Sequence, residues 1–274
     1  MRADQFCAAS SGSQLFREAR KKCVNGMRAT VLTTNVYDGI KKTLSSDSRW
    51  SSKHPSGDFI VFVDDIGFDK IEMANGHAFL FAGFASTISD WKAFLKSSPN
   101  GSQGHPSIDG IALLITNMTT GEIVDHVGQD IQISNVDATV TSFAGSGSSH
   151  AADCWSINKC AKTAVDSAKN FDLFSGGCVR YLELNTLQHN LLNTTNYDEL
   201  AKSFTAQGMV MYTASSHKQV PVNEAALTDV RVGELCNEIA RGQISPSAPC
   251  DAMYHRATNE EKVRLGATLD RIFG

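Results

Sequence analysis

The sequence of 274 residues lacks any long apolar run, and this absence argues against a membrane-spanning or secreted protein. The longest apolar stretches, such as residues 111–115, have the length of a strand and are far too short to span a membrane. Residues 1–26 contain no continuous apolar core of the kind that a secretory signal needs. We therefore expect a cytoplasmic protein with no membrane partner.

The sequence also lacks a basic surplus, closely paired cysteines and a phosphate-binding motif. Its formal net charge is −4, and we expect no nucleic-acid partner, because such partners usually need a clustered basic surface. The seven cysteines include no pair at CxxC spacing, which argues against a zinc or redox site. The Gly/Ser-rich run at 145–149 lacks the Lys-Ser/Thr of a phosphate loop, and no GxGxxG follows a first strand. We predict no metal and no cofactor.

The composition that remains, 42% hydrophobic and 20% charged residues, is typical of a globular protein with a sizeable core. Three segments of different character follow one another. Residues 1–28 form an N-terminal extension or propeptide, with a short basic helix expected at 13–23. Residues 29–214 alternate strand-like and helix-like patterns and predict an α+β domain of two sheets with helices outside. Residues 215–274 form a helical C-terminal extension, with helices expected at 224–240 and 259–272.

Runs of β-prone residues bounded by turn residues predict the strands of the central segment. We expect them at 29–35, 40–46, 59–63, 70–73, 77–83, 111–117, 122–127, 138–143 and 209–213. Asp38-Gly39 is a strong hairpin signal between the first two strands. Helical spacing predicts helices at 86–96 and 198–204 and one long helix from about 150 to 170. The polar stretch 47–56 is expected to be a loop.

Six short segments give the chain a resemblance to a known family. They are ATVL at 29–32, SDSR at 46–49, FDKI at 68–71, FAG at 81–83, AGSGS at 144–148 and DLFSGG at 172–177. Each is short, but together, and in this order, they resemble the proteasome β-subunit and HslV branch of the N-terminal nucleophile (Ntn) hydrolases. The resemblance covers roughly residues 29–214. It implies a four-layer αββα sandwich and a threonine-type peptidase or amidase.

The resemblance also implies a nucleophile and its activating charges. Thr30 would be the nucleophile, and its own α-amine, freed by cleavage of the preceding peptide bond, would take the proton of its hydroxyl. Lys70 would supply positive charge close to that hydroxyl. Asp47 would pair with Lys70.

Four further residues have roles only through the same resemblance. Asp172, Ser175 and Ser146 would surround the α-amine and hold it by hydrogen bonds. Gly83, at a strand-to-helix turn, would offer its backbone N–H to the oxyanion of the tetrahedral intermediate.

Each of these residues also has an ordinary structural role open to it. Lys70 and Asp47 are compatible with a surface ion pair, which contributes about 0–1 kcal/mol. Ser146 suits a cap of the helix that follows it. Asp172 and Ser175 suit a loop in which they satisfy backbone groups.

The start of the first strand departs from the family's pattern. Thr30 lies 17 residues before Asp47, within about one residue of the family's spacing. An alignment through the Asp38-Gly39 turn without a gap instead puts Ala29 at the nucleophile position. Family propeptides are typically cut after glycine, whereas Arg28-Ala29 precedes Thr30.

Two functions therefore stay open. In the first, the leader is removed before Thr30, and the chain is a hydrolase that acts on a peptide or protein substrate. In the second, the site is silent, the N-terminus is uncut, and the chain binds a protein partner as an inhibitor, toxin-neutralising protein or assembly subunit. The family resemblance also allows a homo-oligomer.

Overall fold

The computed structural model describes residues 33–97, 104–214 and 218–274. All the described residues belong to one compact unit, which begins at residue 31 and ends at residue 274. The basic helix expected at 13–23 lies outside them. Residues 218–274 belong to the same compact unit as the strands, and they contribute strands as well as helices to it.

The first sheet, called the small sheet below, has six strands in the order β12-β11-β2-β1-β10-β9. Neighbouring strands are antiparallel throughout. Its central hairpin is short, with four residues between the two strands. The strands are β1 (Asn35–Asp38), β2 (Thr43–Asp47), β9 (Ile131–Ser134), β10 (Val140–Ala144), β11 (Val179–Glu183) and β12 (Gln188–His189).

The second sheet, called the large sheet below, has nine antiparallel strands, eight of them in the order β14-β13-β4-β3-β15-β6-β7-β8. The ninth, β5, pairs with the first half of β6. The strands are β3 (Trp50–Lys53), β4 (Phe59–Val63), β5 (Ile71–Ala74), β6 (His77–Phe84), β7 (Ile111–Asn117), β8 (Ile123–Val127), β13 (Met209–Tyr212), β14 (Gln219–Pro221) and β15 (Ser247–Ala248).

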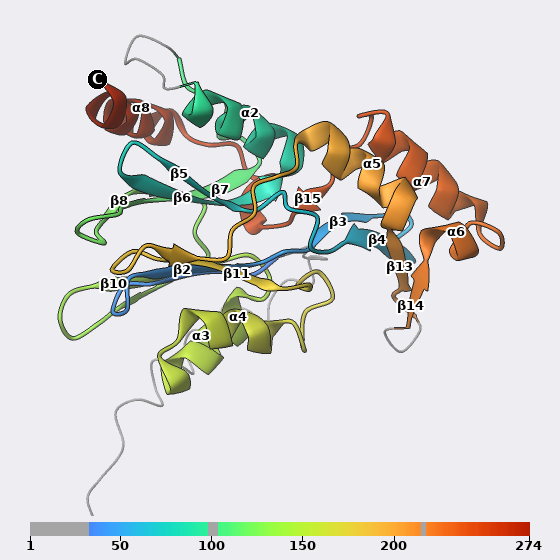
Figure 1. Ribbon diagram of the computed structural model, residues 1–274, viewed down its shortest axis with the longest axis horizontal. Coiled ribbons are helices and arrows are strands. Elements are labelled where there is room, and N and C mark those ends of the chain that lie inside the picture. The colour runs from blue at the N-terminus through green and yellow to red at the C-terminus, as the bar shows by residue number, and fades with distance from the viewer. Residues whose placement is uncertain (1–32, 98–103, 215–217) are drawn as a thin grey trace, which may run out of the picture. The chain divides into compact units, whose positions relative to one another are not determined.

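Helices cover the outer faces of both sheets, so the layers run helix, sheet, sheet, helix (Figure 1). Helices α3 (Ser148–Asn158) and α4 (Ala161–Ala168) pack on the small sheet through mainly small residues. A larger core lies between the large sheet and its helices. Those helices are α2 (Ala85–Lys96), α5 (Tyr197–Gln207), α6 (Val222–Ala225), α7 (Val230–Ala240) and α8 (Asn259–Phe273). The chain is therefore an α+β protein with two stacked antiparallel sheets, as the sequence predicts.

The two sheets meet through an apolar layer to which both contribute. Leu44 and Leu182 of the small sheet pack with Ile71, Leu80 and Leu114 of the large sheet, and all five are buried. Close to the site described below, the Asn35 side-chain amide donates to the Phe81 carbonyl at 2.8 Å. This bond ties the start of β1 to the large sheet.

Several expected elements differ from the structure. The first strand, expected at 29–35, begins only at Asn35 as β1, and the C-terminal segment, expected to be helical, also contributes β14 and β15 to the large sheet. The stretch 47–56, expected as a loop, contains β3, whose serines are buried because they pair with β4 inside the large sheet. The single helix expected from about 150 to 170 is two helices, separated where Lys159 takes a left-handed φ of +47°. The helix expected at 224–240 is likewise split into α6 and α7. The strand β9 was not expected.

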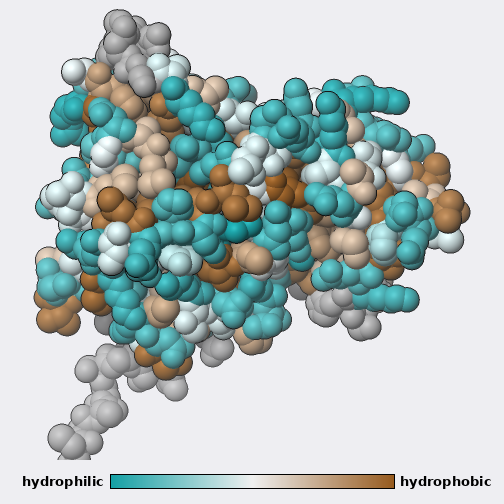
Figure 2. Space-filling model, viewed as in Figure 1, coloured by the Kyte–Doolittle hydropathy of each residue, from teal (hydrophilic) through white to brown (hydrophobic). Residues whose placement is uncertain are grey.

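The surface in the view of Figure 2 is mainly hydrophilic, with hydrophobic residues in small groups. Among the described residues, no helix is both long enough and apolar enough to cross a membrane.

Candidate functional site

A buried threonine hydroxyl, a lysine and a carboxylate meet where the two sheets face each other. Lys70 Nζ donates to Thr33 Oγ1 at 2.6 Å and lies 2.9 Å from Asp47 Oδ1. Thr33 Oγ1 also donates to Asp47 Oδ1. The side chains of Lys70 and Asp47 have no exposed surface, and Thr33 is fully buried. The three polar groups therefore form a triangle with no exposed surface.

Local structure explains why these side chains converge. The register of the β1–β2 hairpin pairs Asn35 with Ser46, so the residues just before β1 lie beside Asp47 at the end of β2. Lys70 precedes β5 in the large sheet and reaches across the interface between the sheets. The four-residue turn of the hairpin therefore places Thr33 and Thr34 beside Asp47, and the Thr33 hydroxyl is the one that meets Lys70.

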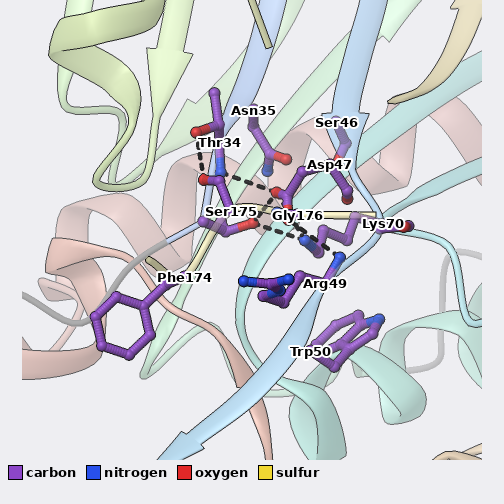
Figure 3. A network of polar contacts seen from close by, with 12 residues as sticks. Thr34, Asn35, Ser46, Asp47, Arg49, Trp50, Lys70, Phe174, Ser175 and Gly176 are labelled. Carbon is purple, nitrogen blue, oxygen red and sulfur yellow. Dashed lines mark hydrogen bonds and ion pairs between the residues drawn. The ribbon is translucent and has the colours of Figure 1, made fainter. Parts of the chain in front are cut away.

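Asp47 is the centre of the network, as the close view in Figure 3 shows. Besides Lys70 and Thr33, three backbone N–H groups donate to its carboxylate. They belong to Thr34 at 2.9 Å, Arg49 at 3.1 Å and Gly176 at 3.2 Å. A buried carboxylate with this many donors is held in one orientation. It can therefore fix the position of the lysine as well as balance its charge.

Lys70 is the positively charged member of the triangle. Burial lowers the pKa of Lys70, an effect that the charge of Asp47 opposes. The ammonium also lies 5.5 Å from the ring centroid of Trp50. A lysine cation this close to a hydroxyl stabilises the negative charge that develops on the oxygen as a base removes its proton and it attacks a carbonyl. The arrangement suits nucleophilic catalysis by Thr33.

The second polar group of the site comes from the loop after α4. Ser175 Oγ donates to Asp172 Oδ2 at 2.5 Å, and it lies 2.7 Å from Thr34 Oγ1. Figure 3 shows the Thr34 and Ser175 side chains facing each other. Burial raises the pKa of Asp172, while the Ser146 and Ser175 hydroxyls lower it. Ser146 therefore lies beside this carboxylate, although its Oγ makes no hydrogen bond of ordinary geometry within the described residues.

A cavity of about 370 Å³ opens beside this loop and is lined by Asp172, Ser175, Gly176 and Arg49 among others. Thr33 is not among its lining residues. The cavity therefore leads to the serine side of the site and stops short of the threonine triangle.

Gly83, the residue before the last in β6, has a backbone conformation of its own. Its φ of +120° is a conformation that L side chains rarely adopt. A Cβ there would lie 2.2 Å from the Gly110 carbonyl oxygen. On its remaining edge Gly83 is the register partner of Ala248 in β15. Only glycine therefore fits at this position.

The sequence predictions can be compared residue by residue with these contacts. The structure brings Asp47 and Lys70 together and places Ser146, Asp172 and Ser175 next to one another. Thr30 lies outside the described residues. Asp172 and Ser175 were expected to hold the α-amine of the nucleophile, whereas in the structure Ser175 contacts the Thr34 hydroxyl.

Sequence reasoning missed Thr33 and Thr34 because it began the first strand at residue 29. The structure begins β1 at Asn35, which puts the threonine pair immediately before it. A two-residue turn at Asp38-Gly39 would pair Thr30 with Asp47. The observed turn has four residues, so Asp38 pairs with Thr43 and residues 33–34 come to lie beside Asp47.

Sequence reasoning also missed Arg49, which makes a two-pronged ion pair with Asp64 at 2.8 and 2.9 Å. Arg49 also donates to the Leu173 carbonyl at 2.8 Å and stacks over Phe62. A Cβ on Gly176 would collide with its guanidinium. Arg49 therefore holds the loop that carries Ser175. The only feature of the sequence that pointed to Arg49 was its place in the SDSR segment at 46–49.

Comparison with known proteins identifies no family. No protein-family model and no curated protein matches the chain. Within residues 33–97, 104–214 and 218–274, no group of three or more His, Cys, Asp or Glu side chains is arranged to hold a metal ion.

Proposed function

We propose that the chain is a threonine-type hydrolase of amide bonds with the αββα architecture of the Ntn hydrolases, and that Thr33 is its nucleophile. The observation that carries this proposal is the 2.6 Å contact between Lys70 Nζ and Thr33 Oγ1, supported by the buried carboxylate of Asp47. This choice moves the nucleophile from Thr30 to Thr33. The two stacked sheets with outer helices support the architecture.

The proposed activation step is cleavage of the Leu32–Thr33 bond. Thr33 Oγ attacks the Leu32 carbonyl carbon, the C–N bond breaks to leave an ester and a free α-amine, and water hydrolyses the ester. Residues 1–32 leave with a new carboxylate. The expected boundary thus lies three residues beyond the one inferred from the sequence.

In the mature chain the α-amine of Thr33 takes the hydroxyl proton as Oγ attacks the substrate carbonyl. It then gives this proton to the leaving amine as the C–N bond breaks, and water releases the acyl group. Lys70 stabilises the negative charge on Oγ, and Asp47 fixes Lys70. The Gly83 N–H is the proposed donor to the oxyanion; one such donor typically contributes about 2.7–4 kcal/mol to transition-state stabilisation.

Intact mass and N-terminal sequencing of the purified chain test this proposal. We expect loss of 32 residues, roughly 3.5 kDa at about 110 Da per residue, and a new N-terminus that reads TTNV. Thr33→Ala should block the cleavage because it removes the attacking oxygen. Thr30→Ala is the matched control and should still be cut. A wild-type chain that keeps residues 1–32 under all conditions contradicts the mechanism.

A second function, binding without catalysis, is favoured by one specific observation. The Thr33 N–H, which must become the α-amine, donates to the Pro249 carbonyl at 2.7 Å. If the chain is never cut, the site is a stable polar core of a protein that binds a protein partner. Co-purification of the uncut chain with one partner, unaffected by Thr33→Ala, would support this function instead.

A further inference from the structure

The strand β15 has an unusual place in the large sheet. It contains only Ser247 and Ala248, yet it lies between β3 and β6 and pairs with both. Its partners are Ser51 in β3 and Phe84 and Gly83 in β6. In the strand order of the sheet, β3 and β6 are therefore joined only through this two-residue strand.

The contacts continue on both sides of β15 and are made largely by the main chain. On one side, the Ala85 N–H donates to the Pro246 carbonyl at 2.9 Å, and the Ser86 N–H donates to Ser245 Oγ at 3.0 Å. On the other side, the Thr33 N–H donates to the Pro249 carbonyl. Residues 245–249, called the inserted segment below, thus run extended through the sheet and reach the nucleophile.

The inserted segment contacts two of the proposed reacting groups. Ala248 is the register partner of Gly83, the proposed oxyanion donor, and the next residue bonds to Thr33. The Ala248 side chain is fully buried in the main core, in the same cluster as Trp50 and Ala85. An extended peptide added between β3 and β6 would need the same backbone groups and the same side-chain space.

The sequence of the inserted segment suits a peptide that lies in the site without being cleaved. Pro246 and Pro249 have no N–H, and their carbonyls accept hydrogen bonds from the Ala85 and Thr33 N–H groups. The Ala248–Pro249 bond beside the site is a tertiary amide. The Pro249 carbonyl also accepts a bond from the very nitrogen that must act as the base. While this hydrogen bond persists, the Thr33 nitrogen is held by the inserted segment and is not directed at its own hydroxyl.

We infer that the inserted segment is an internal inhibitor, which occupies the peptide-binding slot between β3 and β6 and must leave before a substrate reaches Thr33. This inference rests on the proposed function. It explains how the chain can carry a complete threonine triangle whose hydroxyl has no exposed surface. The mature enzyme is latent, and its activity depends on displacement of residues 245–249.

The test uses the full-length gene product and the variant Ala248→Arg, whose side chain cannot fit the buried site and would expel the segment. Ala248→Gly is the matched control, because it keeps the segment in place. The probe is an alkyl β-lactone. Thr33 Oγ attacks its carbonyl, the ring C–O bond breaks, the released alkoxide takes the proton, and the protein gains the mass of the probe. Labelling rates are read by intact mass.

We expect Ala248→Arg to be labelled at least tenfold faster than wild type and Ala248→Gly at the wild-type rate, with no label in Thr33→Ala. Equal rates in all three Ala248 forms, with Thr33 labelled, would overturn the internal inhibitor and leave the hydrolase intact. An uncut N-terminus with no label in any form would overturn the hydrolase.

Hydrogen exchange of the wild-type protein keeps the inference falsifiable if Ala248→Arg does not fold. A segment that can leave predicts that the Ala85 amide exchanges by local opening, at least tenfold faster than the Leu113 amide in the middle of the β6–β7 ladder. If both amides exchange only on global unfolding, the segment is a permanent strand and inhibition by displacement is excluded. This outcome does not depend on catalysis.

Discussion

Two buried lysine–carboxylate pairs lie close together in the sequence but differ in what surrounds them. Lys70 pairs with Asp47 at 2.9 Å, and Lys92 lies 3.3 Å from Glu72. Burial lowers the pKa of both lysines, and in both cases the carboxylate opposes it. By charge and burial alone, the two pairs would be equally good candidates for a functional site.

The third partner separates them. Lys70 donates to the hydroxyl of Thr33, whereas Lys92 donates to the side-chain carbonyl of Asn193 at 2.6 Å and lies over the Phe68 ring. An amide oxygen is no nucleophile, so the Lys92 pair can only hold helix α2 against its neighbours. The comparison shows that a buried ion pair indicates chemistry only when a reactive group completes it.

The largest expected difference between the pairs is in activity. Lys70→Met should lower kcat/KM by at least about 100-fold, because the charge that stabilises the Thr33 alkoxide is lost. Lys92→Met removes a similarly buried lysine whose hydrogen bond goes to Asn193, and it should keep kcat/KM within about threefold of wild type. Both variants and their parent carry Ala248→Arg and have the leader removed at an engineered protease site before Thr33, so that neither the inserted segment nor self-cleavage limits the assay. Steady-state hydrolysis of a fluorogenic peptide amide then measures kcat/KM for each. Similar losses in the two variants would show that the effect comes from general destabilisation.

The next difference is in stability. Asp47→Asn leaves Lys70 without its charge partner in a fully buried site, which typically costs about 3–5 kcal/mol of unfolding free energy. Glu72→Gln should cost less, because the Lys92 amine keeps its bond to Asn193. Urea unfolding followed by circular dichroism gives both values. A larger loss for Glu72→Gln would reverse the assignment of the central pair.

The smallest expected effect is in the pH dependence of stability. A lysine whose folded pKa is lowered binds fewer protons in the folded state than in the unfolded state. The unfolding free energy therefore rises with pH between that lowered value and the ordinary lysine pKa of about 10.4. Lys92→Met should flatten the rise, by at most about 1.4 kcal/mol per pH unit. Urea unfolding between about pH 7.5 and 9.5 measures the slope.

The charges around Lys92 define the control for this last prediction. Glu72 and Asp69 raise its pKa, and Lys96 lowers it. Lys96→Met should therefore leave most of the slope in place, because the Lys96 side chain is 58% exposed. An unchanged slope in Lys92→Met would mean that its pKa is not depressed in the folded chain.

Much of the fold followed from local patterns. The strand expected at 59–63 is β4, and the one expected at 111–117 is β7, since both are continuous apolar runs bounded by polar residues. The strand β3 could not be read in this way, because its two serines carry no apolar pattern. The break between α3 and α4 was missed because the stripe of small residues continues through it.

The candidate site divides along similar lines. Several groups of the site belong to short runs that can be recognised in order along the sequence. They are Asp172 and Ser175 of one loop, the Lys70–Asp47 pair, and Gly83 with its positive φ. Thr33 could not be chosen from these runs. The number of residues in the β1–β2 turn decides which threonine meets Asp47. A two-residue turn at Asp38-Gly39 would bring Thr30 to Asp47, whereas the observed four-residue turn brings Thr33 and Thr34 there.

The sequence by itself therefore determined which chemical groups are available and in which order the chain brings them to the sheets. Tertiary structure alone decided which threonine meets Lys70, because the register of a hairpin depends on pairing across the strands. It also decided that residues 247–248 lie between β3 and β6. A two-residue strand between prolines has no periodic pattern that the sequence could reveal. Its place is set by β3 and β6, whose facing edges both need a hydrogen-bonding partner.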